Sequence, residues 1–204
     1  MNLASSLWLV SPEIFLSVSS LILLLVAAWS QEKAARLITI LSVAALFGAS
    51  TLLMLLSHNP DFKGGADAFD GLYRMDAFGS SAKFLIYLAA IISLIVAPRF
   101  FQDGGKYRSE YPVLILFATI GMGMMVSATD MMTLYIGLEL NSLSAYVLAS
   151  FIRTDIRSSE AGLKYFVLGA LASGMLLFGI SLVYGFAGST SFAVIGEALS
   201  GDLS

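Results

Sequence analysis

Residues 38–56 read ITILSVAALFGASTLLMLL and contain no charged side chain. A run of about 20 apolar residues forms a helix long enough to cross the roughly 30 Å hydrocarbon core of a bilayer. Ile14–Ala28 is a second such run, and the 204-residue chain as a whole is 58% hydrophobic and 12% charged, with a mean hydropathy of +0.87. These features indicate an integral membrane protein in contact with lipid. The continuous runs favour helices, because a β-barrel shows alternating segments of about ten residues.

Loop-forming residues and charge clusters divide the chain into six predicted spans. The sequence therefore predicts an all-α, polytopic transmembrane helix bundle that forms a single domain over residues 1–204. We expect an extramembrane loop with room for a hairpin at 57–81, and an amphipathic segment at 189–204 that precedes a helix missing from this chain. The six spans are approximately Pro12–Trp29, Ala34–Leu56, Ala82–Val96, Pro112–Ala128, Met131–Phe151 and Gly162–Ala187.

The distribution of Lys and Arg predicts how the bundle is oriented. The connections on one side of the bundle are rich in Lys and Arg, whereas the other side has only Lys63, Arg74 and Lys83. Lys83 lies near a helix entrance, from which it is expected to snorkel outward. Because short cytoplasmic loops carry the excess of Lys and Arg, the amino terminus is predicted to face outside, toward the periplasm. The connections after the first, third and fifth spans hold Lys33, Arg36, Arg99, Lys106, Arg108, Arg153 and Arg157.

Composition argues against several classes of function. The chain has no cysteine and one histidine, His58, which follows the second span and is interpreted as a solvated interfacial residue. Disulfides and cysteine-ligated iron–sulfur clusters are therefore excluded, and we expect no metal or cofactor to be bound by this chain. A net charge of −3 without a Lys/Arg-rich segment gives no indication of nucleic-acid binding.

Polar residues recur along one face of the fifth span. Tyr135, Glu139, Ser142 and Tyr146 are spaced 4, 3 and 4 residues apart, which places them in a narrow stripe of a helix. A charged side chain at bilayer depth costs about 2.5 to 3.5 kcal/mol on insertion scales, so Glu139 requires a reason beyond packing. We predict that Glu139 transfers protons, with the three hydroxyl residues as secondary relay candidates. The alternative is a buried acid that only fixes helix packing.

Lys164 is the second candidate for proton transfer. Glu160 precedes it by four residues in the favourable Glu-to-Lys order, so the pair could simply brace a helix end. Against that alternative, Lys164 is followed by the apolar run Tyr165–Leu168, and we expect its side chain to point into the bundle. Because the hairpin between the fifth and sixth spans is short, Lys164 would then lie within several ångströms to about a dozen of Glu139, where its charge lowers the cost of ionising that acid.

Two further features are interpreted as structural. Gly162, Gly169 and Ser173 form a ridge of small residues on the side of the sixth span opposite Lys164, which indicates a close contact between helices. Asp130 is a good N-cap for the fifth span.

Two strings of sequence carry a resemblance to a known family. DMMTLYIGLELNSLSAY at 130–146 and DIRSSEAGLKYFVLGA at 155–170, with Tyr184-Gly185 and the early Ser11–Ile14, closely resemble the antiporter-like membrane subunits of respiratory complex I. The resemblance covers essentially the whole chain. It implies a multi-pass subunit of a proton-pumping translocase in the bacterial inner membrane, with no redox centre of its own.

The same resemblance assigns roles to residues and to partners. Glu139 matches the essential glutamate of the family's fifth helix, and Lys164 matches the lysine of its sixth. NADH, FMN, iron–sulfur clusters and quinone would be bound by partner subunits, and the partners would be the other membrane and peripheral subunits of complex I. Family members have about fourteen helices in two inverted repeats, so this chain is expected to be an N-terminal portion that does not pump alone.

Two alternatives stay open from the sequence. Multi-subunit sodium/proton antiporters share the same glutamate and lysine helices, so the chain could belong to a secondary transporter. It could also be a structural subunit that seals and braces a membrane arm without a proton path of its own.

Overall fold

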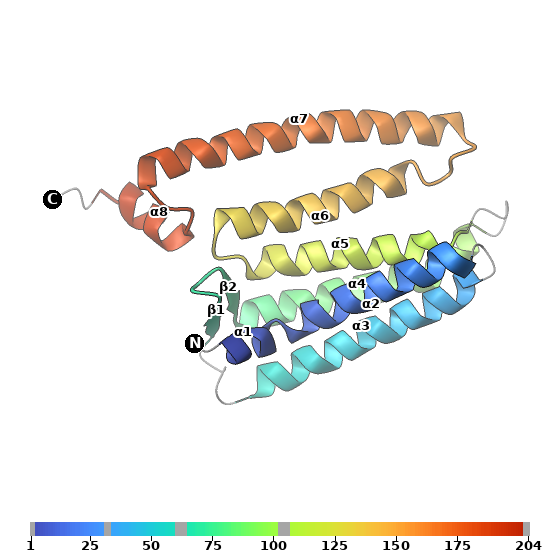
Figure 1. Ribbon diagram of the computed structural model, residues 1–204, viewed down its shortest axis with the longest axis horizontal. Helices are drawn as coiled ribbons and strands as arrows, with labels where there is room; N and C mark the ends of the chain where they lie inside the picture. The colour runs from blue at the N-terminus through green and yellow to red at the C-terminus, as the bar shows by residue number, and fades with distance from the viewer. Residues whose placement is uncertain (1–2, 31–33, 60–64, 102–106, 202–204) are drawn as a thin grey trace.

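The computed structural model describes residues 3–30, 34–59, 65–101 and 107–201. Six long helices run side by side along the bundle (Figure 1). They correspond one to one with the six predicted spans, so the all-α polytopic fold class is confirmed. Their bounds are α2 (Ser11–Ser30), α3 (Ala35–His58), α4 (Ala77–Phe100), α5 (Glu110–Ser127), α6 (Met131–Ala149) and α7 (Ile156–Ala187).

Short elements gather at one end of the bundle. Figure 1 shows these elements near the amino terminus, beside the start of α6 and the end of α7. They are α1 (Leu3–Leu9), β1 (Ala66–Ala68), β2 (Tyr73–Met75) and α8 (Phe192–Leu199). The 57–81 connection therefore contains a hairpin, and part of the 189–204 segment is helical.

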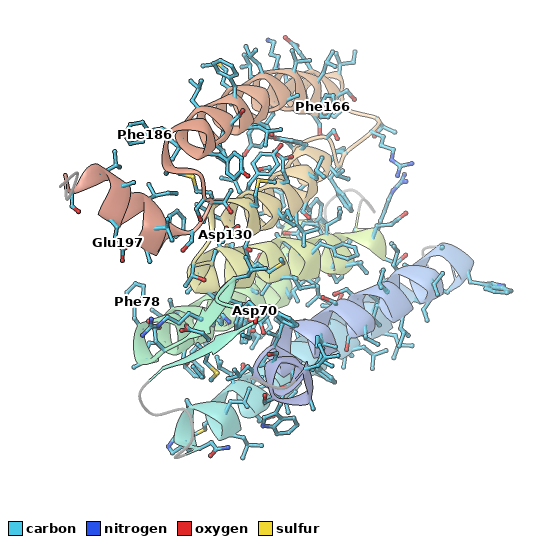
Figure 2. All side chains as sticks on the ribbon, turned by 60° about the vertical axis from the view of Figure 1, so that its left-hand side comes forward. Asp70, Phe78, Asp130, Phe166, Phe186 and Glu197 are labelled. Atoms are coloured by element: carbon cyan, nitrogen blue, oxygen red, sulfur yellow. The ribbon has the colours of Figure 1, made fainter. Side chains whose placement is uncertain are left out.

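Five of the described helices are long and apolar enough to cross a membrane, namely α2, α3, α4, α5 and α7. The helix α6 falls outside this set because Glu139, Asn141 and its hydroxyl residues lower its hydropathy. Large apolar side chains cover much of the outer surface, and Figure 2 shows Phe78, Phe166 and Phe186 on α4 and α7, where all three are exposed. Such a surface suits contact with hydrocarbon.

Two helices begin earlier than the apolar runs suggested. Asp76 caps α4, because its carboxylate accepts a hydrogen bond from the Gly79 amide at 2.6 Å. Asp155 caps α7 in the same way, accepting from the Arg157 amide at 2.9 Å. The predicted starts at Ala82 and Gly162 were therefore too late, because the capping carboxylate and not hydrophobicity sets the first turn.

The hairpin is more than a surface loop. Its strands pair antiparallel with Ala66 opposite Met75 and Ala68 opposite Tyr73. The hydroxyl of Thr129, in the short α5–α6 connection, donates to the Gly71 carbonyl at 2.5 Å. Tyr73 and Met75 are buried against the helices. The hairpin therefore closes one end of the bundle and sends a tyrosine into it.

The packed core lies among α2, α3, α4 and α5, and α5 joins this core to α6. At the crossing of α5 and α6 the two backbones touch, because a Cβ added at Gly121 would come 2.6 Å from the Gly137 carbonyl oxygen. By contrast, only Gly162 and Ile180 of α7 are buried among the described residues. The core is formed by Leu9, Leu16, Ile38, Leu46, Leu56, Leu94, Val113 and Leu116.

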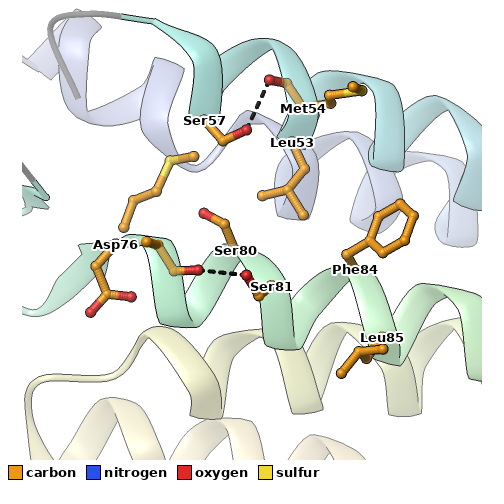
Figure 3. A pocket seen from close by; sticks show the side chains of 10 residues that line it. Leu53, Met54, Ser57, Asp76, Ser80, Ser81, Phe84 and Leu85 are labelled. Atoms are coloured by element: carbon orange, nitrogen blue, oxygen red, sulfur yellow. Dashed lines mark hydrogen bonds between the residues drawn. The ribbon is translucent and has the colours of Figure 1, made fainter. Parts of the chain in front are cut away.

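An apolar groove of about 630 Å³ lies between the hairpin ends of α3 and α4 (Figure 3). Leu53, Phe84 and Leu85 line it. Its Ser57 and Ser81 hydroxyls donate to carbonyls of their own helices at 2.9 and 2.8 Å. The groove therefore suits hydrocarbon better than a polar ligand.

The basic residues of the predicted cytoplasmic loops lie at the end of the bundle away from the hairpin. Phe101, Tyr107, Tyr111 and Phe151 pack there with ring centroids 5.3 to 5.8 Å apart. Of the basic residues in these loops, the structure describes Arg36, Arg99, Arg108, Arg153 and Arg157, whereas Lys33 and Lys106 lie outside the described residues. The orientation of this end toward the cytoplasm stays a prediction.

Candidate functional site

The predicted acid lies at the contact between α6 and α7. Ser173 of α7 donates a hydrogen bond to the Oε1 atom of Glu139. The hydroxyl oxygens of Tyr135 and Ser173 are 2.9 Å apart. A serine hydroxyl has one hydrogen to donate, so Tyr135 must be the donor to Ser173. The three side chains form a directed hydrogen-bond chain from Tyr135 through Ser173 to Glu139.

This arrangement confirms part of the predicted stripe and adds a member. Tyr135 and Glu139 share one face of α6, as their spacing predicts, and that face meets α7. Ser173, interpreted from the sequence as a helix-packing residue, is the link between them. A signal was present in the sequence, because a serine within a small-residue ridge brings a donor to the helix contact.

The remaining members of the stripe lie further along α6. Tyr146 is buried, and its ring packs edge-on against Tyr165 of α7 with centroids 4.8 Å apart. Its hydroxyl lies against Gly169, where a Cβ atom would overlap it. Ser142, which lies between Glu139 and Tyr146 along α6, is half-buried. Tyr146 is therefore fixed by aromatic packing, and its role in a proton relay stays a prediction.

Lys164 lies on the other side of α7. Its Nζ atom is 2.5 Å from Glu160 Oε1, and the Lys164 and Glu160 side chains are 68% and 58% exposed. Among the described residues, no hydrogen bond or ion pair joins Lys164 to Glu139. The expectation that Lys164 points into the bundle is therefore wrong for this structure.

The small-residue ridge explains the position of Lys164. Gly162 lies against Ser150, and Gly169 lies against Tyr146, so the ridge turns this face of α7 toward α6. Because Lys164 is on the opposite face, it turns away from Glu139. The ridge itself was predicted as a close helix contact, and that prediction is confirmed. A proton-transfer role for Lys164 stays a prediction.

A second acid site was missed by the sequence analysis. Glu13 of α2 and Lys83 of α4 are 4% and 1% exposed and form an ion pair through Oε1 of Glu13. Tyr73 of β2 joins them: its hydroxyl donates to Glu13 Oε1 at 2.9 Å and accepts from Lys83 Nζ at 2.5 Å. The expectation that Lys83 snorkels outward is therefore wrong, because the hairpin covers it and a carboxylate faces it from inside.

The tyrosine of this second site is held in its neutral form. Burial, followed by the charge of Glu13, raises the pKa of Tyr73 above its ordinary value. It therefore remains a hydrogen-bond donor at neutral pH. A sequence signal existed: Glu13 begins the first span and Lys83 begins the third, and the starts of these two spans lie on the same side of a membrane.

Asp130 is the predicted cap of α6, and the prediction is confirmed. Its Oδ1 atom accepts hydrogen bonds from the Met132 and Thr133 amides at 2.8 and 3.1 Å, while Thr190 donates to Oδ2. The cap therefore also ties the start of α6 to the segment after α7. Among the described residues, no group of three or more His, Asp or Glu side chains could hold a metal ion.

Comparison with known proteins identifies relatives of this chain. The family model described as NADH:quinone oxidoreductase/Mrp antiporter, transmembrane, matches residues 128–203. NADH-quinone oxidoreductase subunit N of Erythrobacter litoralis is 54% identical over 100% of this chain and 42% of its own length. The subunit N of Rhizorhabdus wittichii is 59% identical over 98% of this chain and 41% of its own length.

Two solved structures share the fold. A chain in respiratory complex I from Thermus thermophilus with bound aureothin is 27% identical, with a TM-score of 0.70 over 93% of this chain and 41% of that one. A chain of the membrane-bound sulfane sulfur reductase, an archaeal respiratory membrane complex, is 20% identical with a TM-score of 0.73 over 100% of this chain and 41% of its own, which shows a shared fold alone.

This chain spans about two fifths of the length of these relatives. The apolar helices and the bacterial relatives together indicate a multi-pass protein of the bacterial inner membrane. The chain belongs to the family of antiporter-like membrane subunits that includes NADH-quinone oxidoreductase subunit N.

Proposed function

We propose that the chain is part of a proton-translocating membrane subunit of NADH:quinone oxidoreductase, which couples quinone reduction to proton movement through Glu139. Its partners would be the other membrane and peripheral subunits of that complex, which would carry NADH, FMN, iron–sulfur clusters and quinone. The relatives named subunit N support the assignment to this complex. The observation that carries the proton role is the hydroxyl chain ending on a carboxylate within a bundle of apolar helices.

The hydrogen-bond chain supports one proton-transfer step. A proton that reaches the Tyr135 hydroxyl from its other side displaces the Tyr135 proton to Ser173 Oγ, and the Ser173 proton moves to Glu139 Oε1, so that each broken O–H bond is replaced by a new one. The incoming proton thereby neutralises Glu139, which lowers the cost of holding it in hydrocarbon. The relay therefore has a direction, from Tyr135 toward Glu139.

Lys164 enters this proposal as a residue that modulates Glu139 by its charge. For it to act, its exposed ion pair with Glu160 must open, and an exposed pair of this kind is worth only about 0.3–0.5 kcal/mol. Breaking it is therefore inexpensive. The alternative left open by the sequence, that the pair braces the start of α7, agrees with the observed contact.

The test is Glu139→Gln in the full-length subunit, measured as protons translocated per electron in membrane vesicles that contain the assembled complex. The substitution keeps the shape of the side chain and removes its proton exchange. We expect the ratio to fall while the subunit still assembles. Glu197→Gln is the matched control, because Glu197 is an exposed acid of α8. An unchanged ratio in the Glu139 variant with normal assembly would favour a structural subunit.

A second candidate is a subunit of a multi-subunit sodium/proton antiporter, because the matched family description includes the Mrp antiporter. Purification of the full-length protein from its native membrane separates the two. Copurification with NADH dehydrogenase activity would support complex I. Sodium-driven proton exchange without that activity would support the antiporter.

A further inference from the structure

The buried pair of Glu13 and Lys83 is unusual for its surroundings. Both charges are almost fully buried, and both bond to Tyr73 as well as to each other. Replacement of a buried ion pair by apolar side chains of similar volume is often neutral or stabilising, so stability alone does not account for a pair in this place. The cluster of ionisable groups therefore calls for a chemical role.

Two polar atoms at the cluster lack a hydrogen-bond partner among the described residues. Glu13 Oε2 and the Tyr87 hydroxyl are buried and have no hydrogen-bond partner within the described part of the chain. Tyr87 follows Lys83 by four residues on α4, so both lie on one face of that helix, and the charge of Glu13 acts on Tyr87. Oε1 of Glu13 thus binds Lys83 and Tyr73, while Oε2 has no partner among the described residues.

The helix α5 separates this cluster from the Glu139 site. Gly123 faces Glu13, since a Cβ atom there would lie 3.8 Å from Oε1, whereas Gly121 faces Gly137 of α6. Two residues of a helix are about 200° apart, so these glycines mark opposite faces of α5. The two acids therefore flank a single helix, one on the α2–α4 side and one on the α6–α7 side.

We propose that Glu13, with Lys83 and Tyr73, forms a second proton-exchange site of this chain, on the side of α5 away from Glu139. This inference rests on the proposed function. In the exchange step the Lys83 ammonium gives a proton to Glu13 Oε1, which turns two buried charges into a neutral amine and a neutral acid. The neutral carboxyl group then turns so that this O–H points to the Tyr87 side, where its proton leaves, and an incoming proton restores the ammonium.

Two further groups lie around the pair. Asp76, the cap of α4, acts electrostatically on Lys83. Tyr73 bonds to both partners and can hold the amine and the acid in place while the proton moves. The tyrosine is therefore a positioning residue, and Glu13 is the residue that exchanges the proton.

The test is the double variant Glu13→Gln with Lys83→Met in the full-length subunit within the assembled complex. It removes both charges and keeps both shapes, so a purely structural pair would be replaced without loss. We expect normal assembly and quinone reduction, but a fall in protons per electron comparable with that of Glu139→Gln. A normal ratio would overturn the inference. If Glu139→Gln lowers the ratio and the double variant does not, this site alone fails; if only the double variant lowers it, the Glu139 proposal fails.

Tyr73→Phe keeps the inference testable if the double variant does not assemble. It removes one hydroxyl and leaves both charges and the ring in place. We expect assembly to persist and the proton ratio to fall, because the amine and acid are no longer held together by the hydroxyl. A normal ratio in assembled Tyr73→Phe complex would show that the cluster is structural.

Discussion

The two acids of this bundle are stabilised in different ways. Glu13 is buried in the packed half of the molecule and faces a cation, whereas Glu139 is half-buried between α6 and the exposed α7 and faces neutral hydroxyls. A cation favours the ionised acid strongly, while a hydroxyl donor favours it weakly. The proposed proton exchange would therefore involve neutral hydroxyls alone at Glu139, but also the charge of Lys83 at Glu13.

The largest effect is expected from a substitution that breaks the buried pair of Glu13 and Lys83. Lys83→Met alone leaves the Glu13 carboxylate buried without its cation, and removing one partner of a buried pair costs about 3–5 kcal/mol. We expect the full-length subunit to be largely lost from the membrane, measured by its amount relative to wild type. The double variant with Glu13→Gln should restore it. A fully stable single variant would contradict the structure's assignment of this pair.

A smaller effect is expected at the contact between α5 and α6, which lies between the two sites. Gly121→Ala places a Cβ atom 2.6 Å from the Gly137 carbonyl, so α5 and α6 must separate. Overpacking of this kind costs about 1–3 kcal/mol. Thermal unfolding of the full-length protein in detergent should show it as a lowered Tm. Gly174→Ala is the control, because no atom lies within 4 Å of a Cβ atom at that position.

Ser173→Ala sharpens the comparison at the weaker site. It removes the donor to Glu139 and interrupts the path from Tyr135. A hydrogen bond to a charged group is worth about 1.5–3 kcal/mol, so the loss of this donor should shift the infrared band of the Glu139 carboxyl group relative to wild type. Ser142→Ala, on the same stripe, should leave the band in place. An unmoved band in Ser173→Ala would contradict the directed chain.

The smallest effect concerns the exposed pair on α7. Glu160→Gln should change the free energy of unfolding by less than about 0.5 kcal/mol, because an i,i+4 ion pair with both side chains exposed contributes only about 0.3–0.5 kcal/mol. Chemical denaturation checks this value. A markedly larger loss would mean that the pair braces α7, and it would count against a modulating role for Lys164.

The sequence predicted the features that depend on local pattern. The apolar runs placed six helices, the Asp130 side chain marked the start of α6, and the spacing of Tyr135 and Glu139 put them on one face. The predictions from sequence were wrong where the position of a charged side chain depends on the groups packed against it. Lys83 was assigned to the membrane surface and Lys164 to the interior, and the structure reverses both.

By itself, then, the sequence determined that this chain is a bundle of membrane helices with an acid in its fifth span, because hydrophobicity and helical period are properties of the chain alone. Only the tertiary structure decided which charges meet. Glu13 and Lys83 are 70 residues apart and pair because the hairpin and α5 enclose the space between α2 and α4. The free-energy cost of a charged side chain in hydrocarbon depends on the groups that face it, and tertiary packing decides which groups those are.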